Sequence, residues 1–114
     1  MVENRKYVPD RCDIVWLDFN PNIGHEQAGK RPAVVITPKN YNEKTGLAIF
    51  CPITSKIKNY PFEVKLPSYC KIKGVILVDQ IKSLDWKRRN AAFVFKLHEY
   101  ILNEVIEKLK LLIF

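Results

Sequence analysis

The chain has 114 residues, of which 47% are hydrophobic and 27% are charged, with a formal net charge of +7 at neutral pH. This length predicts a single domain over residues 1–114, and the share of apolar residues excludes an intrinsically disordered chain. The N-terminus has no apolar segment typical of a signal peptide, and no apolar run reaches the ~20 residues that span a bilayer, so we expect a cytoplasmic protein without a membrane segment.

The first predicted strand covers residues 13–19, where apolar side chains alternate between two faces. Ile14 and Trp16 share one face, and Val15, Leu17 and Phe19 share the other. We expect Trp16 to be buried and Phe19 to be the aromatic residue that is free to stack on a ligand. A turn at residues 20–22 ends the strand. A long loop then runs to residue 31, and Pro32 begins a second strand over residues 32–37.

The remaining elements follow in short segments. Residues 40–46 read as a hairpin connection in which Gly46 supplies a positive φ. Further strands are predicted over residues 47–53, 62–66, 74–78 and 81–86. From Ile101 to Ile113 the apolar residues recur at steps of three and four, which indicates one amphipathic helix. These elements predict a mainly β (α+β) fold, a small antiparallel barrel with a C-terminal α-helix packed on it.

The last four residues are more apolar than one helical stripe requires. Leu111, Leu112, Ile113 and Phe114 follow one another without a polar residue. This excess favours either a subunit interface or additional packing on the core.

The positive charge is unevenly distributed. Residues 1–31 carry five basic and five acidic side chains, whereas residues 32–114 carry fourteen basic and seven acidic ones, so 14 − 7 accounts for the whole excess. A local excess of this kind indicates a polyanionic partner, although a solvated lysine-rich face would give the same pattern.

The cysteines indicate neither a disulfide framework nor a metal site. Cys12, Cys51 and Cys70 are odd in number and form no Cys-x-x-Cys pair. Cys51 lies in an apolar run, where we expect a buried thiol that packs as a small hydrophobe. A cysteine nucleophile would need a histidine partner, and the chain has only His25 and His98. We expect no metal and no cofactor.

The densest chemistry lies in residues 24–32, where two glycines frame an imidazole, a carboxylate, an amide and two cations. Polar groups in a loop between two strands are held on a rigid scaffold, which is a common arrangement for functional residues. Arg31 is permanently charged and its planar fork matches phosphate oxygens. We interpret the loop as a site that acts on phosphate and the chain as a small ribonuclease. The alternative is an ordinary solvated surface loop.

Several segments in register resemble the MazF/PemK-type toxins. They are residues 13–16, the loop at residues 24–32 with the apolar run at residues 34–36, Pro52-Ile53-Thr54-Ser55, and Asp79-Gln80-Ile81-Lys82-Ser83. The resemblance runs from about Tyr7 to the C-terminus. It implies a barrel similar to the SH3 and plasmid-toxin folds, a homodimer, and a sequence-selective endoribonuclease that is paired with an antitoxin. One position departs from the family, which usually has glycine where this chain has Cys12.

RNA carries its own nucleophile in the 2′-OH group. Metal-free cleavage needs that hydroxyl in line with the phosphate, a base, an acid and a cation for the phosphate charge. Arg31 is the cation, and Thr54, which resembles the site threonine of the family, donates a hydrogen bond to the same phosphate. Glu26 is either the general base or a residue that orients Arg31, because a guanidinium beside it would lower its pKa. His25 is a further candidate acid near neutral pH, whereas we expect His98 to be structural.

The predicted RNA contacts surround these residues. By resemblance, Asp79 and Gln80 match a family pair that reads base edges, and the alternative for Asp79 is a turn carboxylate satisfied by backbone groups. Lys56 and Lys82 would contact phosphates or contribute solubility alone. The other predicted RNA-binding residues are His25, Gln27 and Phe19.

Two other functions use the same fold. Related plasmid toxins poison DNA gyrase, and their function depends on a Trp-Gly-Ile end, whereas this chain ends in Leu112-Ile113-Phe114. A non-catalytic basic RNA-binding barrel is the third possibility. For the nuclease we expect two partners, single-stranded RNA and an acidic, partly disordered antitoxin segment, which are attracted by the same basic surface and exclude each other.

Overall fold

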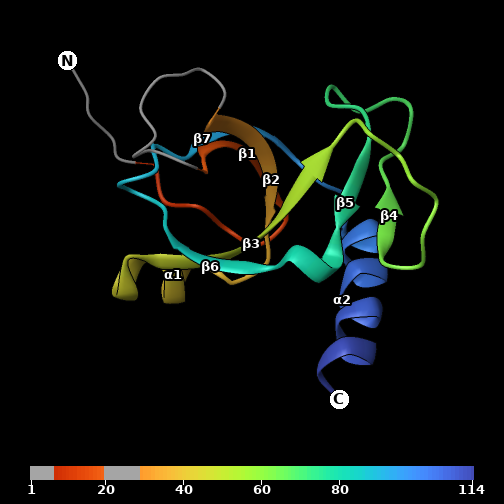
Figure 1. Cartoon of the computed structure of the whole chain (residues 1–114). Helices are drawn as coiled ribbons and strands as arrows, with labels where there is room; N and C mark the ends of the chain where they lie inside the picture. The colour runs from red at the N-terminus through yellow and green to blue at the C-terminus, as the bar shows by residue number, and fades with distance from the viewer. Residues whose placement is uncertain (1–6, 20–28) are drawn as a thin grey trace.

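The computed structural model describes residues 7–19 and 29–114. Seven antiparallel strands form one sheet in the order β4-β5-β3-β2-β1-β7, and β6 pairs with β3 beside this path. The sheet curls into a small barrel with a C-terminal helix against it (Figure 1), which confirms the expected fold class. The elements are β1 (Asp13–Asp18), β2 (Lys30–Val35), α1 (Lys39–Thr45), β3 (Leu47–Thr54), β4 (Glu63–Lys65), β5 (Val75–Leu77), the 3₁₀ turn η2 (Val78–Gln80), β6 (Lys82–Asp85), β7 (Ala92–Lys96) and α2 (Glu99–Ile113).

The alternation of the strands separates two hydrophobic clusters on the two faces of the curled sheet. The first cluster includes Ile14, Val34 and Cys51 and is covered by α2. The second includes Leu17, Ala33 and Phe50 and is closed by Trp86. Cys51 is fully buried, as expected, and burial raises the pKa of its thiol to about 12, so it is not a thiolate nucleophile near neutral pH.

The start of β2 differs from the prediction. The strand begins at Lys30 and not at Pro32, so Arg31 is a strand residue that pairs with Leu17 of β1. Pro32 faces Trp16 on β1 and precedes the ladder to β3, which starts at Ala33. The missing N–H of Pro32 therefore removes no bond from that ladder.

The prediction of a hairpin connection at residues 40–46 was wrong, because the segment forms α1. Asn42 in this helix is fully buried, and its amide donates to the carbonyl oxygens of Pro9 and Thr37 and accepts from the Thr37 hydroxyl. These bonds, of which the one to Pro9 spans 33 positions of sequence, stabilise a helix that the local sequence does not favour. Gly46 does adopt the expected positive φ, of 76°, at the C-terminal cap.

The prediction that Trp16 is buried was also wrong, since its side chain is 39% exposed. Trp16 points to the same side as Ile14, but its cross-strand neighbours are Pro32 and Ala92, which are too small to cover it. The buried tryptophan is Trp86, whose indole N–H donates to the carbonyl oxygen of Asn42 at 2.9 Å. The strand β7 was not predicted, and it closes the barrel by pairing with β1.

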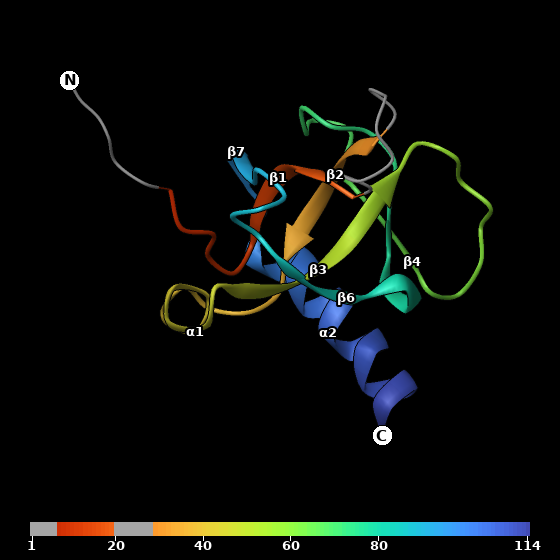
Figure 2. The same cartoon turned by 60° about the vertical axis from the view of Figure 1, so that its left-hand side comes forward.

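The C-terminal helix spans Glu99–Ile113, so it contains the predicted apolar period from Ile101 to Ile113 and begins two residues before it. It buries Ile101, Leu102, Val105 and Leu109 against the first cluster. Its last turn projects beyond the sheet (Figure 2), and Leu111 to Phe114 are exposed, with Phe114 at 97%. The apolar end of the chain therefore does not extend the core of this subunit.

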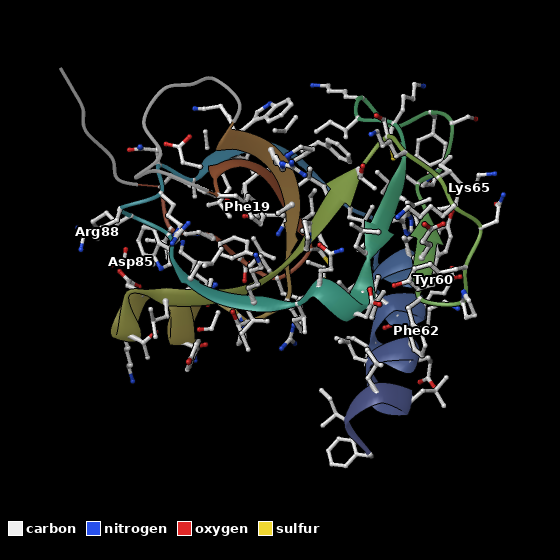
Figure 3. All side chains as sticks on the ribbon, viewed as in Figure 1. Phe19, Tyr60, Phe62, Lys65, Asp85 and Arg88 are labelled. Carbon is white, nitrogen blue, oxygen red and sulfur yellow. The ribbon has the colours of Figure 1, made fainter. Side chains whose placement is uncertain are left out.

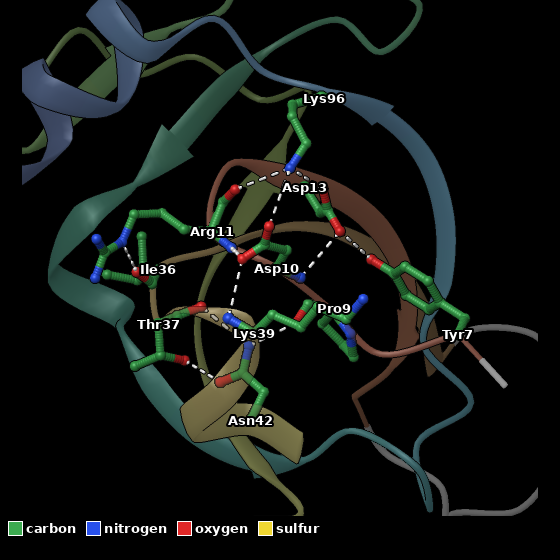
Figure 4. Close-up of polar contacts among 10 residues, drawn as sticks. All are labelled: Tyr7, Pro9, Asp10, Arg11, Asp13, Ile36, Thr37, Lys39, Asn42 and Lys96. Atoms are coloured by element: carbon green, nitrogen blue, oxygen red, sulfur yellow. Dashed lines mark hydrogen bonds and ion pairs between the residues drawn. The ribbon is translucent and has the colours of Figure 1, made fainter. Parts of the chain in front are cut away.

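A polar network closes the barrel where β1 begins (Figure 4). Asp13 is only 3% exposed, and its carboxylate accepts the Tyr7 hydroxyl at 2.5 Å and pairs with the Lys96 ammonium at 2.8 Å. Burial, together with the hydrogen bond and the charge of Asp13, raises the pKa of Tyr7 far above its usual value. Beside it, Cys12 has a φ of 80°, in the region that favours glycine.

Candidate active site

The register of β2 and β3 brings together the two residues expected to bind the scissile phosphate. Ala33 pairs with Pro52 and Val34 with Cys51, so the same register continued by two residues puts Arg31 opposite Thr54. Residues that face each other in an antiparallel pair share one side of the sheet. Arg31 is exposed and Thr54, the last residue of β3, is half-buried. Both side chains therefore belong to the rim of the second hydrophobic cluster.

The hydroxyl of Thr54 is held in place from the following turn. Its Oγ1 accepts the backbone N–H of Lys56 at 3.1 Å, which leaves the hydroxyl hydrogen available for a donated bond. Gly74 lies directly against the backbone of Thr54, because a Cβ on Gly74 would lie 2.1 Å from the Thr54 carbonyl oxygen. A side chain at position 74 would push Thr54 out of its present position.

Phe19 and Lys82 complete the same rim. Phe19 follows β1 on the side of Leu17 and packs on the second cluster. The Lys82 ammonium lies 5.6 Å from the centroid of the Phe19 ring, within cation–π range. Lys82 itself pairs with Phe50 of β3 and is exposed. We call Phe19, Arg31, Thr54 and Lys82 the cationic rim, because the strand register puts the two cations, the aromatic ring and the hydroxyl on the face of the sheet that carries the second cluster.

Three predicted site residues, His25, Glu26 and Gln27, lie outside the described residues. The described ends of their segment meet at the rim, since the Phe19 N–H donates to the Gly29 carbonyl oxygen at 2.8 Å. The two residues that border the segment, Phe19 and Gly29, are therefore neighbours, and Gly29 is two residues before Arg31.

Asp79 and Gln80 lie in η2, and both are exposed. The Asp79 carboxylate accepts a hydrogen bond from the Tyr60 hydroxyl, which raises the pKa of Tyr60. The partner is thus a side chain in the β3–β4 loop and not a backbone group of the turn. Figure 3 shows Tyr60 on the side of the barrel near β4 and α2, away from Phe19. His98 is exposed at the start of α2, where its ring packs 4.7 Å from that of Tyr100.

The sequence did not disclose two groups that support the rim. Arg89 binds the end of β1 across 70 positions of sequence, and Gly74 packs on Thr54 from another strand connection. Both contacts depend on tertiary structure. The signal available for Gly74 was its position directly before the apolar run of β5. For Arg89 the sequence offered only its membership of the general excess of basic residues.

Residues 7–19 and 29–114 contain no group of three or more His, Cys, Asp or Glu side chains arranged to hold a metal ion. Within the same ranges, none of the helices has the length and apolar character needed to cross a membrane.

Comparison with known proteins gives consistent matches over nearly the whole chain. Residues 10–113 match the family of PemK-like, MazF-like toxins of type II toxin–antitoxin systems. The chain is 51% identical over 86 residues to the endoribonuclease toxin MazF of Escherichia coli. The matched segment covers 75% of this chain and 77% of that protein.

Solved structures give the same result. The crystal structure of MazF from Deinococcus radiodurans superimposes with a TM-score of 0.86 at 48% identity, covering 94% of this chain and 97% of that one. A MazE-MazF structure from the same organism gives a TM-score of 0.84 at 44% identity, over 94% of this chain and 96% of that one.

Proposed function

This chain belongs to the PemK-like, MazF-like toxins of type II toxin–antitoxin systems and is an endoribonuclease toxin, and we propose that it cuts single-stranded messenger RNA at selected sequences without a metal ion. The proposal is supported by the register of the β2–β3 ladder, which ends at Ala33 and Pro52 and which, continued by two residues, puts Arg31 opposite Thr54. Phe19 and Lys82 on the same rim add a stacking surface and a second cation.

The proposed reaction uses the 2′-OH of the RNA as the nucleophile. The 2′-oxygen loses its proton and forms a bond to phosphorus, and the bond from phosphorus to the 5′-oxygen breaks as that oxygen gains a proton. The products are a 2′,3′-cyclic phosphate and a 5′-hydroxyl end. Charge grows on the non-bridging oxygens during the step, where Arg31 and the Thr54 hydroxyl stabilise it. Glu26 either takes the 2′-proton or orients Arg31, and His25 is the candidate that supplies the proton to the 5′-oxygen.

The surrounding residues would select and hold the substrate. Phe19 offers a face on which a base stacks, with Lys82 beside it for an adjoining phosphate. Asp79 and Gln80 present hydrogen-bonding edges from η2, and Lys56 is exposed directly after Thr54. His25 and Gln27 would contact the RNA from the loop that starts at Phe19.

The partners follow from the same surface. The Deinococcus radiodurans relative has been solved in a MazE-MazF complex, and we propose an acidic antitoxin segment for this chain, which has a net charge of +7. Such a segment would compete with RNA for the cationic rim. We further propose that residues 1–114 act as one domain, that the chain forms a homodimer, and that it works in the cytoplasm.

Incubation of the purified protein with a long natural transcript in excess EDTA tests the reaction. We expect cleavage at a few sequence-related positions, and each downstream fragment should accept a phosphate from polynucleotide kinase without prior dephosphorylation, because its 5′-end is a hydroxyl. An absolute requirement for Mg²⁺, or 5′-phosphate products, would contradict the proposed chemistry. Saturation with the cognate antitoxin should abolish cleavage.

A further inference from the structure

The turn between β6 and β7 is built so that one arginine is held in place. The Asp85 carboxylate accepts the backbone N–H groups of Lys87 at 3.1 Å and Arg88 at 3.0 Å. The Arg89 N–H then donates to the Asp85 carbonyl oxygen at 3.1 Å. Asn90 closes the turn with a φ of 56°, a conformation that asparagine tolerates better than most residues. The backbone of Arg89 is therefore fixed on both sides.

From this turn Arg89 reaches the end of β1. Its Nη1 donates to the carbonyl oxygens of Asp18 at 3.2 Å and of Phe19 at 2.5 Å. The backbone adds a bond from the Asp18 N–H to the Arg89 carbonyl oxygen at 2.9 Å, and the Asn90 amide donates to the Asp18 carboxylate at 2.9 Å. Arg89 is half-buried, so these charge-assisted bonds are only partly exposed to competing water.

Phe19 is the residue that these contacts orient. Its N–H is bound to the Gly29 carbonyl oxygen and its own carbonyl oxygen is bound to Arg89. Both peptide groups next to its Cα are thus held, which fixes the direction of the Cα–Cβ bond and so limits where the ring can lie. The ring lies beside the Lys82 ammonium at one end of β6, and Arg89 follows the other end of the same strand.

We propose that Arg89 is a positioning residue for RNA binding, which fixes the Phe19 ring beside Lys82 so that a base of the substrate can stack there. This inference rests on the proposed function, because it assigns Phe19 and Lys82 to the RNA. Arg89 acts through Phe19 and does not itself contact the phosphate that is cut.

The neighbouring Arg88 supplies a matched control. It is exposed and lies in the same turn, and Figure 3 shows its side chain directed outward, away from Phe19. Replacing either arginine by alanine removes the same charge. We expect Arg89→Ala to raise the KM for a short RNA about tenfold while kcat stays within about twofold, because stacking on Phe19 contributes equally to the bound substrate and the transition state. Arg88→Ala should leave both constants within about twofold of the wild type.

The KM distinguishes a loss of Phe19 positioning from a loss of folded protein. A smaller folded fraction lowers the apparent kcat and leaves KM unchanged. Arg89→Lys, which retains one donor and the charge, should give an intermediate KM. In a Phe19→Ala background, Arg89→Ala should raise KM no further, since the residue through which it acts is gone. Equal KM values for the Arg88 and Arg89 variants would overturn the proposal, and so would full additivity with Phe19→Ala.

This test is kept separate from the test of cleavage by measuring binding of an RNA that has a 2′-deoxy sugar at the cut site. Such an RNA lacks the nucleophile and cannot be cut there. A wild-type protein that binds this RNA but does not cut the natural one would refute the proposed reaction. The Kd values for Arg89→Ala and Arg88→Ala would still decide the role of Arg89: a tenfold difference supports it and equal values overturn it.

Discussion

Charged side chains gather at both ends of β1, and the two groups differ in how their charges are used. At its first residue, the buried Asp13 binds Tyr7 and Lys96, and the nearby Asp10 N–H donates to it at 3.0 Å. Past its last residue, the cationic rim presents Arg31 and Lys82 as exposed cations, and Lys82 lies beside the Phe19 ring. Removing one partner of a charge pair bound inside the fold leaves the other charge buried and uncompensated, which destabilises the protein, whereas cations presented at the surface attract a polyanion. Substitutions at the two ends should therefore separate stability from activity.

Arg31→Ala gives the largest expected effect. Cleavage should fall about a thousandfold, because a donor to the developing phosphate charge is lost. The midpoint of urea unfolding should stay within the error of the wild type, since the side chain is exposed. Single-turnover cleavage and denaturation measured on the same preparation check both statements, with Arg88→Ala as the control for loss of charge. An active Arg31→Ala protein would remove the central residue of the proposed site.

Gly74→Ala tests the backbone that supports the rim. The new Cβ would overlap the Thr54 carbonyl oxygen, so Thr54 must move. A displacement of about 1 Å at a reacting group can cost ~100-fold in rate, and we expect a loss of that size in kcat. Gly46→Ala is the matched control, because Gly46 also has a positive φ but nothing within 4 Å of its added Cβ. It should lose about 1 kcal/mol of stability and keep its activity per folded molecule. Equal kcat values in the two variants would show that Thr54 does not depend on Gly74.

Asp13→Asn should show the opposite behaviour at the other end of β1. The amide would replace one of the two oxygens that accept from Tyr7 and Lys96 by a donor and would remove the charge that Lys96 pairs with. We therefore expect a loss of about 2 kcal/mol in the free energy of unfolding. This loss is small for a buried pair because Lys96 is half exposed and its ammonium also approaches the Asp10 carboxylate at 3.6 Å. Glu107→Gln is the control at an exposed ion pair, and its effect should stay below about 0.5 kcal/mol. The cleavage rate of folded Asp13→Asn protein should match the wild type, and a large fall would mean that the two ends are coupled.

The sequence predicted what depends on local pattern. Apolar runs located the two strands next to Arg31 and Thr54, although the predicted bounds, residues 32–37 and 47–53, left both residues just outside. The three- and four-residue period located α2. It failed where distant contacts decide the structure. Asn42 is buried through bonds to Pro9 and Thr37, which turns a predicted hairpin connection into α1. Trp16 is exposed because its cross-strand neighbours are small. The resemblance implied that Arg31 and Thr54 lie close together. The register of β2 and β3 supplies the geometric reason for it.

Cys12 gives the smallest effect and the finest test of the structural end of β1. Its φ of 80° is held by two backbone bonds, from its N–H to the Val35 carbonyl oxygen at 3.0 Å and from the Leu97 N–H to its own carbonyl oxygen at 2.8 Å. The resemblance to the family predicts glycine here, and this chain bears the strain of a side chain in that conformation. Cys12→Gly and Cys12→Ala both remove the buried thiol, but only glycine also relieves the strain. We therefore expect Cys12→Gly to be more stable than Cys12→Ala by about 1 kcal/mol, although glycine is less stable than alanine in ordinary strands and helices. Urea unfolding of the two variants measures this difference. If Cys12→Ala is instead the more stable variant, the turn before Asp13 relaxes to accept a Cβ.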